Sequence, residues 1–247
     1  MKNLLLFIFL SILTNSIFSQ NQSNFKLSQD DLLTISDFDA TSNDIVNGDT
    51  LSNYINLEFV TEEEFNMQKI KPKNYFVRDT LNVRKENGVI ILNCNNKVVK
   101  YIDNDEEGDS FSLFEYFGQI PFMNKYVVSG YFYEWINCFL VDKDSGKETV
   151  LFDTPLIPPN KKHIISFSYN PYLNNTDFQL FSISGNDINL ITELHFSRWK
   201  TTERDNFFWG KDNSYYLEVT HSENNEDTND IYYIKISIKS LYSNIFD

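Results

Sequence analysis

The sequence predicts an all-β protein, built as a meander of short antiparallel strands behind a short helical N-terminal extension. Three observations carry this prediction. From residue 75 onward, apolar residues alternate with polar ones, which is the period of a strand with one buried face. Turn signals rich in Asn, Gly, Asp and Pro separate these runs. The runs follow one another at short, regular spacing, which is typical of a sandwich, a barrel or a propeller.

The N-terminus has the three-part pattern of a secretory signal peptide, which we assign to residues 1–19. Lys2 precedes an apolar run from Leu4 to Leu13, and small residues follow as far as Ser19. This run is too short to cross a bilayer, which takes about 20 apolar residues. We therefore expect cleavage after Ser19 and a secreted or periplasmic mature protein. No later apolar run approaches spanning length and no Cys lies near the cleavage site, so we expect no membrane anchor.

Residues 20–74 are predicted to form a polar, partly helical extension ahead of an all-β domain at 75–247. Ser28 and Asp31 have the spacing of a capping box, which indicates a short helix. A stronger capping box begins at Thr61 and continues with three Glu residues before Phe65. Because acidic side chains suit the positive end of a helix, we predict a helix near 62–68 that ends by Lys71.

The first strands form hairpins. An alternating run at 81–85 leads to Asn87-Gly88, a strong signal for a tight turn, and 89–92 is the return strand. A second turn at Asn95-Asn96 leads to a strand at 97–102. Further strands are predicted at 126–134, 136–142, 147–152, 163–169, 178–184, 188–194, 214–220 and 231–238. The turns between them are predicted at 143–146, 155–160, 174–175 and 185–186.

A frame of strand, hairpin, strand and proline-rich bend recurs about every 40 residues, the size of one propeller blade. It is carried by FLVDKDSGKET at 139–149, by Pro155 and by PPNKKHIIS at 158–166, and the stretches at 178–183 and 207–217 resemble the succeeding blades. The stretch 126–200 resembles propeller-type repeats of secreted bacterial proteins. In their usual Ser-Pro-Asp-Gly-Lys turn, this chain has Pro158 for Ser and Lys161 for Gly. The resemblance implies a small propeller or an open array of about four blades, with no activity attached.

The composition limits the partners. The chain has 35 acidic and 21 basic residues, a net charge of −14, and loss of Lys2 with the signal segment makes it one unit more negative. Such a surface repels phosphate backbones, so nucleic acid is not an expected partner. Basic protein patches and soluble cations, including Ca²⁺, remain compatible with it.

Two cysteines, Cys94 and Cys138, leave two readings open. In an oxidising compartment they can form a disulfide. Otherwise they are two small buried apolar residues, since free Cys is among the most buried residue types. No C-x-x-C is present, so neither a thioredoxin-like site nor a Cys zinc site is encoded.

The most metal-like string is the acidic run at 103–109, in which Asp103, Asp105 and Asp109 carry the candidate ligands. An EF-hand loop needs a Glu at its twelfth position, but that position is Phe114 here. We therefore favour a solvated acidic loop over a metal site. The similar string at 142–146 is explained by a hairpin turn.

The strand around Glu134 has large apolar residues on both faces, which predicts a central, covered position. Glu134 would then share a face with Phe132 and Ile136 and would need a partner, such as Arg198 or Arg204. We favour a structural hydrogen-bonding role for Glu134 over a ligand-binding or acid–base role. On this basis we expect Glu134→Leu to lower the melting temperature more than Glu106→Leu does.

Aromatic residues make up 16% of the chain, which raises the question of a sugar-stacking platform. Its candidates are Trp135, Trp199 and Trp209, although sheet core is the favoured interpretation of these rings. No G-x-S-x-G, H-E-x-x-H, G-x-G-x-x-G or P-loop motif is present, and His163, His195 and His221 are scattered. We therefore expect no cofactor, and the sequence leans against an enzyme.

These observations favour a secreted or periplasmic, non-enzymatic binding protein that meets a protein partner through its interstrand loops. One alternative is a carbohydrate-binding protein or a carboxylate-based glycan hydrolase. The other is a structural component of the cell envelope. A cleft lined jointly by tryptophans and carboxylates would favour the glycan reading, whereas scattered tryptophans would favour protein binding.

Overall fold

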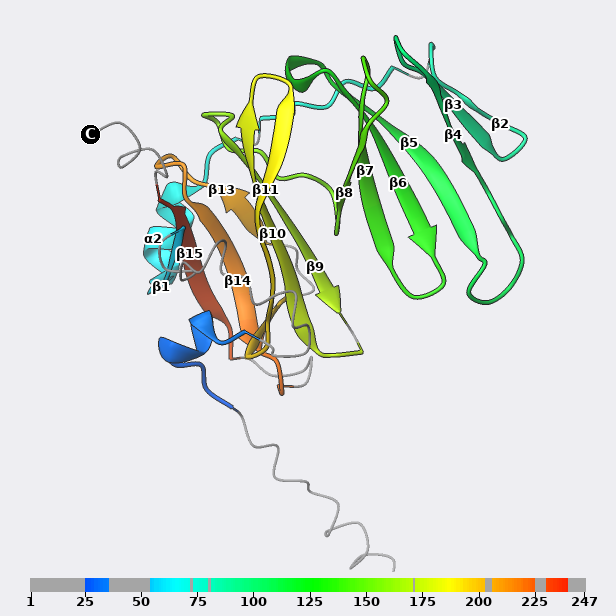
Figure 1. Cartoon of the computed structure of the whole chain (residues 1–247). Coiled ribbons are helices and arrows are strands. Elements are labelled where there is room, and N and C mark those ends of the chain that lie inside the picture. Colours follow the sequence, from blue (N-terminus) through cyan, green and yellow to red (C-terminus); the bar gives the residue numbers. More distant parts are fainter. Residues whose placement is uncertain are drawn as a thin grey trace, which may run out of the picture.

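Figure 1 shows the computed structural model, which describes residues 25–35, 54–71, 73–79, 81–170, 172–202, 206–224 and 230–239. The predicted signal segment and its cleavage site lie outside the described residues, and so does Arg204. In the described part, no helix is long and apolar enough to cross a membrane.

The predicted all-β fold is confirmed. The described chain forms four antiparallel sheets that stand next to one another in an open fan, and they do not close into a barrel (Figure 1). At one end of the fan lie β2 (Lys85–Glu86), β3 (Val89–Asn93) and β4 (Val98–Ile102). The second sheet contains β5 (Ser112–Ile120), β6 (Lys125–Phe132), β7 (Ile136–Asp142) and β8 (Glu148–Leu151). The third contains β9 (His163–Asn170), β10 (Asn175–Ser184) and β11 (Asp187–Phe196). The fourth contains β1 (Ile55–Val60), β12 (Trp199–Thr201), β13 (Phe207–Trp209), β14 (Tyr215–His221) and β15 (Tyr232–Ile238).

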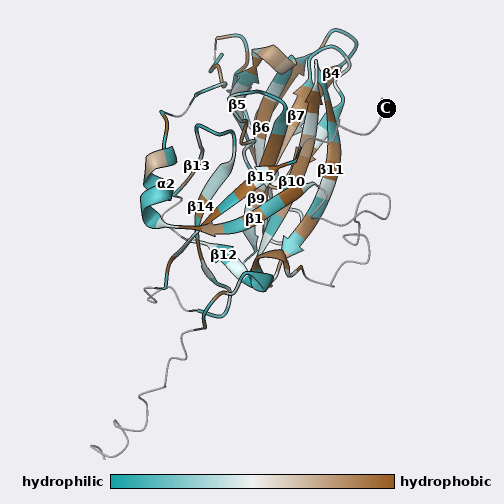
Figure 2. Ribbon diagram, turned by 90° about the vertical axis from the view of Figure 1, so that its left-hand side faces the viewer, coloured by the Kyte–Doolittle hydropathy of each residue, from teal (hydrophilic) through white to brown (hydrophobic). Residues whose placement is uncertain are grey.

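Three hydrophobic cores lie between the four sheets, one for each pair of neighbouring sheets. Successive residues of one strand serve different cores, as the two-residue period requires. In β6, Val127 packs toward the third sheet with Ile164, whereas Val128 packs toward the first sheet with Ile90. The core between the third and fourth sheets is the largest and includes Trp199. In Figure 2 the hydrophobic residues are concentrated in the strands of the sheets.

The helix predicted near 62–68 is present as α2 (Glu62–Gln68). The Thr61 side chain accepts a hydrogen bond from the Glu64 backbone N–H at 3.1 Å, which confirms the cap. Phe65 is fully buried and packs edge-on against Phe208, with 4.9 Å between ring centroids. Helix α2 therefore covers the outer face of the fourth sheet.

The predicted hairpins are present as well. Asn87 and Gly88 have φ values of 49° and 76°, the left-handed conformations that a two-residue turn needs, and they join β2 to β3. The predicted strand at 81–85 is reduced to β2, and the turn at 143–146 joins β7 to β8.

The N-terminal segment differs most from expectation. The sequence places residues 55–60 in an extension, but they form β1, and all of β1 pairs with β15. Further upstream, a short 3-10 helix, η1 (Asp30–Leu33), lies against the fourth sheet. There the Trp199 indole N–H donates to the Leu32 carbonyl at 3.2 Å. The segment thus belongs to the folded body, because its apolar residues complete the largest core.

Candidate functional site

The expectation that Glu134 is buried is wrong. Strand β6 ends at Phe132 and β7 begins at Ile136, and the Phe132 N–H donates to the Trp135 carbonyl at 2.8 Å. Residues 133–135 therefore form the end of a hairpin, and Glu134 is exposed there. The apolar run continues past the edge of the sheet, so its pattern imitates a covered strand. Glu106 is exposed as well. The burial argument for expecting Glu134→Leu to lower the melting temperature more than Glu106→Leu does therefore no longer holds.

This hairpin end is instead an exposed aromatic surface. Trp135 is 52% exposed and stacks on Phe132, with 5.4 Å between ring centroids. A second hairpin end, between β9 and β10, exposes large apolar residues at the same lower end of the fan (Figure 1). We call these residues the aromatic ends; they are Tyr131, Tyr133, Trp135, Ile136, Tyr172 and Leu173.

The acidic run at 103–109 joins β4 to β5 close to the first of these hairpin ends, because Ser112 in β5 pairs with Phe132 in β6. Its candidate metal ligands do not form a cluster. Asp103 pairs with the Lys85 ammonium and accepts the Phe114 N–H at 2.9 Å, whereas Asp105 and Asp109 are exposed. Among the described residues, no group of three or more His, Cys, Asp or Glu side chains is placed to hold a metal ion.

The three tryptophans do not converge. Trp199 is fully buried in the largest core, and Trp135 is exposed at a hairpin end of the second sheet. Trp209 lies in β13 and lines a cleft that contains no carboxylate. The sugar-stacking platform considered from the sequence is therefore not assembled by these residues.

The two cysteines are not bonded to each other; both are free. Cys138 belongs to the core between the second and third sheets, whereas Cys94 packs against the core on the other side of the second sheet. The second sheet thus lies between them. Burial raises the pKa of the Cys138 thiol, so it behaves as a protonated apolar residue.

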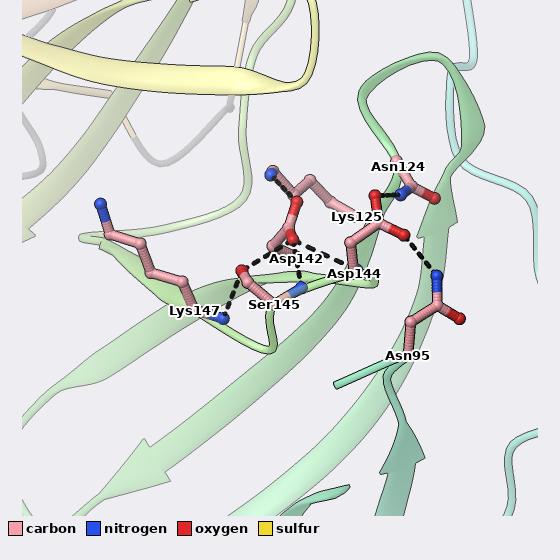
Figure 3. Close-up of polar contacts among 7 residues, drawn as sticks. All are labelled: Asn95, Asn124, Lys125, Asp142, Asp144, Ser145 and Lys147. Carbon is pink, nitrogen blue, oxygen red and sulfur yellow. Dashed lines mark hydrogen bonds and ion pairs between the residues drawn. The ribbon is translucent and has the colours of Figure 1, made fainter. Parts of the chain in front are cut away.

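A polar network occupies the opposite end of the second sheet (Figure 3). Asp142 accepts hydrogen bonds from the Lys125 ammonium at 2.6 Å and from the Ser145 backbone N–H at 2.7 Å. Asp144 accepts side-chain amide protons of Asn95 at 2.5 Å and of Asn124 at 2.8 Å. These contacts tie the β3–β4 turn to the β7–β8 turn, so the string at 142–146 serves the fold.

A polar hollow of about 320 Å³ lies beside this network and reaches the β10–β11 turn. Burial alone would raise the pKa of Asp142, but the hydrogen bonds from Lys125 and Ser145 outweigh it and hold the pKa well below its usual range. A general acid for glycan cleavage needs a raised pKa instead. Asp142 is therefore an ionised structural carboxylate.

The histidines occupy separate sites. His195 contacts the Asp177 carboxylate at 2.5 Å between β11 and β10. His221 is nearly buried at the end of β14, where its ring stacks on Phe25 with 5.3 Å between centroids. His163 begins β9 in the third sheet, and burial lowers its pKa.

An apolar cleft of about 370 Å³ was not anticipated from the sequence. Three segments form it, namely Ile70 with residues 73–76 after α2, residues 154–159 between β8 and β9, and β13, with Tyr215 from β14. One signal was available in the sequence. The alternating lysines Lys69, Lys71 and Lys73 precede Tyr75 and Phe76, a basic cluster in an acidic chain.

Comparison of the chain with protein-family models, with curated proteins and with solved structures gives no match.

Proposed function

We propose that this chain is a secreted or periplasmic, non-enzymatic protein that binds a protein partner through its aromatic ends. The observation that carries the proposal is the exposure of large aromatic residues at two hairpin ends on one end of the fan. Tyr and Trp are enriched in the buried centres of protein interfaces, where they supply large contact areas. The signal-peptide pattern of residues 1–19 supports the location.

The neighbouring acidic loop indicates the charge that the partner should carry. Asp105, Glu106, Glu107 and Asp109 are all exposed in the segment that precedes β5. An apolar centre beside a negative rim fits a partner whose apolar patch is flanked by Lys or Arg, and the charges accelerate association. The aromatic residues would supply most of the affinity, and the acidic loop would supply the specificity for a basic partner.

We also propose that the fan is an open array of propeller-like blades. Four small antiparallel sheets stacked with separate cores support this reading. The turn at 158–161 supports it too, because Lys161 has a φ of 57°, the conformation for which glycine is the usual residue.

The test uses the mature chain, 20–247, as bait for the envelope and secreted proteins of its own source, with quantitative mass spectrometry as readout. The proposal expects one stoichiometric partner whose capture is lost with Tyr133→Ser combined with Trp135→Ser. The matched control is Val98→Ser combined with Ile102→Ser, which removes apolar residues that are 53% and 59% exposed on β4. Capture must persist in this control.

A third variant, Glu106→Lys combined with Glu107→Lys, tests the acidic rim. It should weaken capture at low salt and have less effect at high salt, because screening already removes the attraction there. Equal capture by the aromatic variant and the wild type would contradict the proposal. If the chain instead binds glycans and this binding depends on Trp135, the ligand of the aromatic ends is a carbohydrate and not a protein.

A further inference from the structure

The apolar cleft lies away from the aromatic ends and is a separate feature of the molecule. Its walls are held by backbone pairing. Leu156 and Ile165 exchange two backbone hydrogen bonds of 2.9 and 3.0 Å, which fix the 154–159 segment against β9. Trp209 pairs with Tyr215 across the β13–β14 ladder. The Tyr75 hydroxyl donates to the Pro158 carbonyl at 3.3 Å and so joins two of the walls.

The lining is mostly apolar, with Lys73, Asn74 and Thr154 as its polar residues, and it contains no acidic residue. Its rings and aliphatic side chains come from all three segments and include Tyr75, Pro155, Ile157 and Phe207. A volume of about 370 Å³ falls within the range of small-ligand pockets, roughly 300–1,000 Å³. A preformed apolar cleft of this kind binds the hydrocarbon part of a small molecule without the cost of opening a core.

One lysine lines this cleft, and a second contacts the ring of a lining residue. Lys73 is a lining residue, and its ammonium lies 5.5 Å from the centroid of the Tyr75 ring. The Lys161 ammonium lies 5.5 Å from the same ring and 4.4 Å from the centroid of Phe122. Two cations thus meet around one aromatic ring of the cleft, in a chain with a net charge of −14. The one charged residue that lines the cleft is therefore a cation, opposite in sign to the net charge of the chain.

We propose that the cleft binds a small soluble amphiphile with an apolar tail and a carboxylate head. The tail lies between the walls formed by Pro155 and Phe207, and the head meets the ammonium group of Lys73. Desolvated apolar area supplies most of the affinity. Lys73 discriminates carboxylates from neutral and cationic amphiphiles of the same length. The ligand is a monomeric alkyl carboxylate, and not a lipid in a bilayer.

Decanoate, kept below the concentration at which it forms micelles, is the probe for the mature chain. Calorimetry should give one saturable site, and the tryptophan fluorescence of the chain should change with the same dependence, because Trp209 lines the cleft. Lys73→Glu should weaken decanoate binding about tenfold or more, because it replaces an attraction at close range with a repulsion. Phe207→Ala should weaken it as well by removing part of an apolar wall.

Two matched variants separate the cleft from general effects. Lys100→Glu makes the same charge change on the exposed face of β4, and Leu190→Ala truncates an exposed apolar residue of β11. Both should bind decanoate as the wild type does. Decanol should bind the wild type and Lys73→Glu equally well.

The proposal is overturned if the wild type shows no saturable binding of decanoate or if Lys73→Glu binds it with unchanged affinity. Vesicles of anionic phosphatidylglycerol provide the remaining arm. If the chain binds these vesicles, and Lys73→Glu reduces that binding whereas Phe207→Ala does not, then Lys73 serves a membrane surface and the proposed ligand is wrong. A failed partner capture leaves these outcomes unaffected, because the aromatic ends contribute no residue to the cleft.

Discussion

At the scale of single residues, Gly118 shows how closely the backbone segments pack. It follows a bulge in β5 and has a φ of 142°. A Cβ atom at Gly118 would lie 2.7 Å from the Val77 carbonyl oxygen, and Val77 forms an isolated bridge with Gln119. Only glycine fits both the backbone angle and the space.

Gly118→Ala is therefore expected to lower the free energy of unfolding by about 2 kcal/mol or more, through strain and loss of the bridge. Gly108→Ala is the matched control, since Gly108 has a φ of 94° but no atom near its absent Cβ. That control should cost only about 1 kcal/mol. Urea unfolding monitored by circular dichroism compares the two, and equal losses would show that Val77 yields to the added methyl group.

His221 carries a prediction about pH. Burial lowers its pKa below the ordinary 6.5, although Asp31 and Glu223 act in the opposite direction. Its Nδ1 accepts the Glu223 backbone N–H at 3.1 Å, so the ring is neutral in the fold. The unfolded chain then binds more protons than the folded one below about pH 6.5, and stability decreases as the pH falls.

We expect the melting temperature to decline between pH 7 and pH 5 and to decline less in His221→Phe. The Phe side chain keeps the stack on Phe25 but has no group to protonate. Thermal unfolding at a series of pH values measures the difference. Parallel curves for the two proteins would assign the acid sensitivity to other groups, of which His163 is the first candidate because burial also lowers its pKa.

At the scale of elements, η1 shows that the N-terminal segment completes the largest core. Leu32 is fully buried, whereas its neighbour Leu33 is 40% exposed. Leu32→Ala should lower the free energy of unfolding by about 3 kcal/mol, because a cavity remains beside Trp199. Leu33→Ala should change it by no more than about 0.5 kcal/mol. Denaturant titration followed by tryptophan emission measures both, and similar values would mean that η1 does not contribute to the core.

The elements also show what the sequence can reveal. The hairpin at Asn87-Gly88 is predicted correctly, because Asn and Gly adopt the positive φ values that this turn needs more readily than other residues do. The break between the predicted strands 126–134 and 136–142 is real, but the exposure of Glu134 there was hidden, since no Gly, Asn or Pro marks the hairpin end at 133–135 and the aromatic pattern continues across it. Strand β1 was missed because its partner, β15, lies far away in the sequence. The candidate sites follow the same rule: the aromatic excess was visible, but the cleft needs three segments that only the fold brings together.

At the scale of the whole molecule, the two ends of the fan are finished differently. Helix α2 covers the fourth sheet with the buried ring of Phe65. The first sheet has no such cover among the described residues, and Ile91, Val98 and Ile102 are exposed on its outer face. A stack of sheets is stabilised mainly by contacts between neighbours, so a terminal sheet with one bare face is held from one side only.

The first sheet is therefore expected to open locally before the rest of the fan does. In β3 and β4, alternate residues are exposed, whereas all seven residues of β14 are buried. Native-state hydrogen exchange should give the amides of β3 and β4 lower opening free energies than those of β14. Ile91→Lys should leave the opening free energies of β3 and β4 nearly unchanged, because the Ile91 side chain points away from the core. If the amides of β3 and β4 instead exchanged only by global unfolding, the four sheets would form one cooperative unit. The exposed outer face would then not lower the local stability of the first sheet.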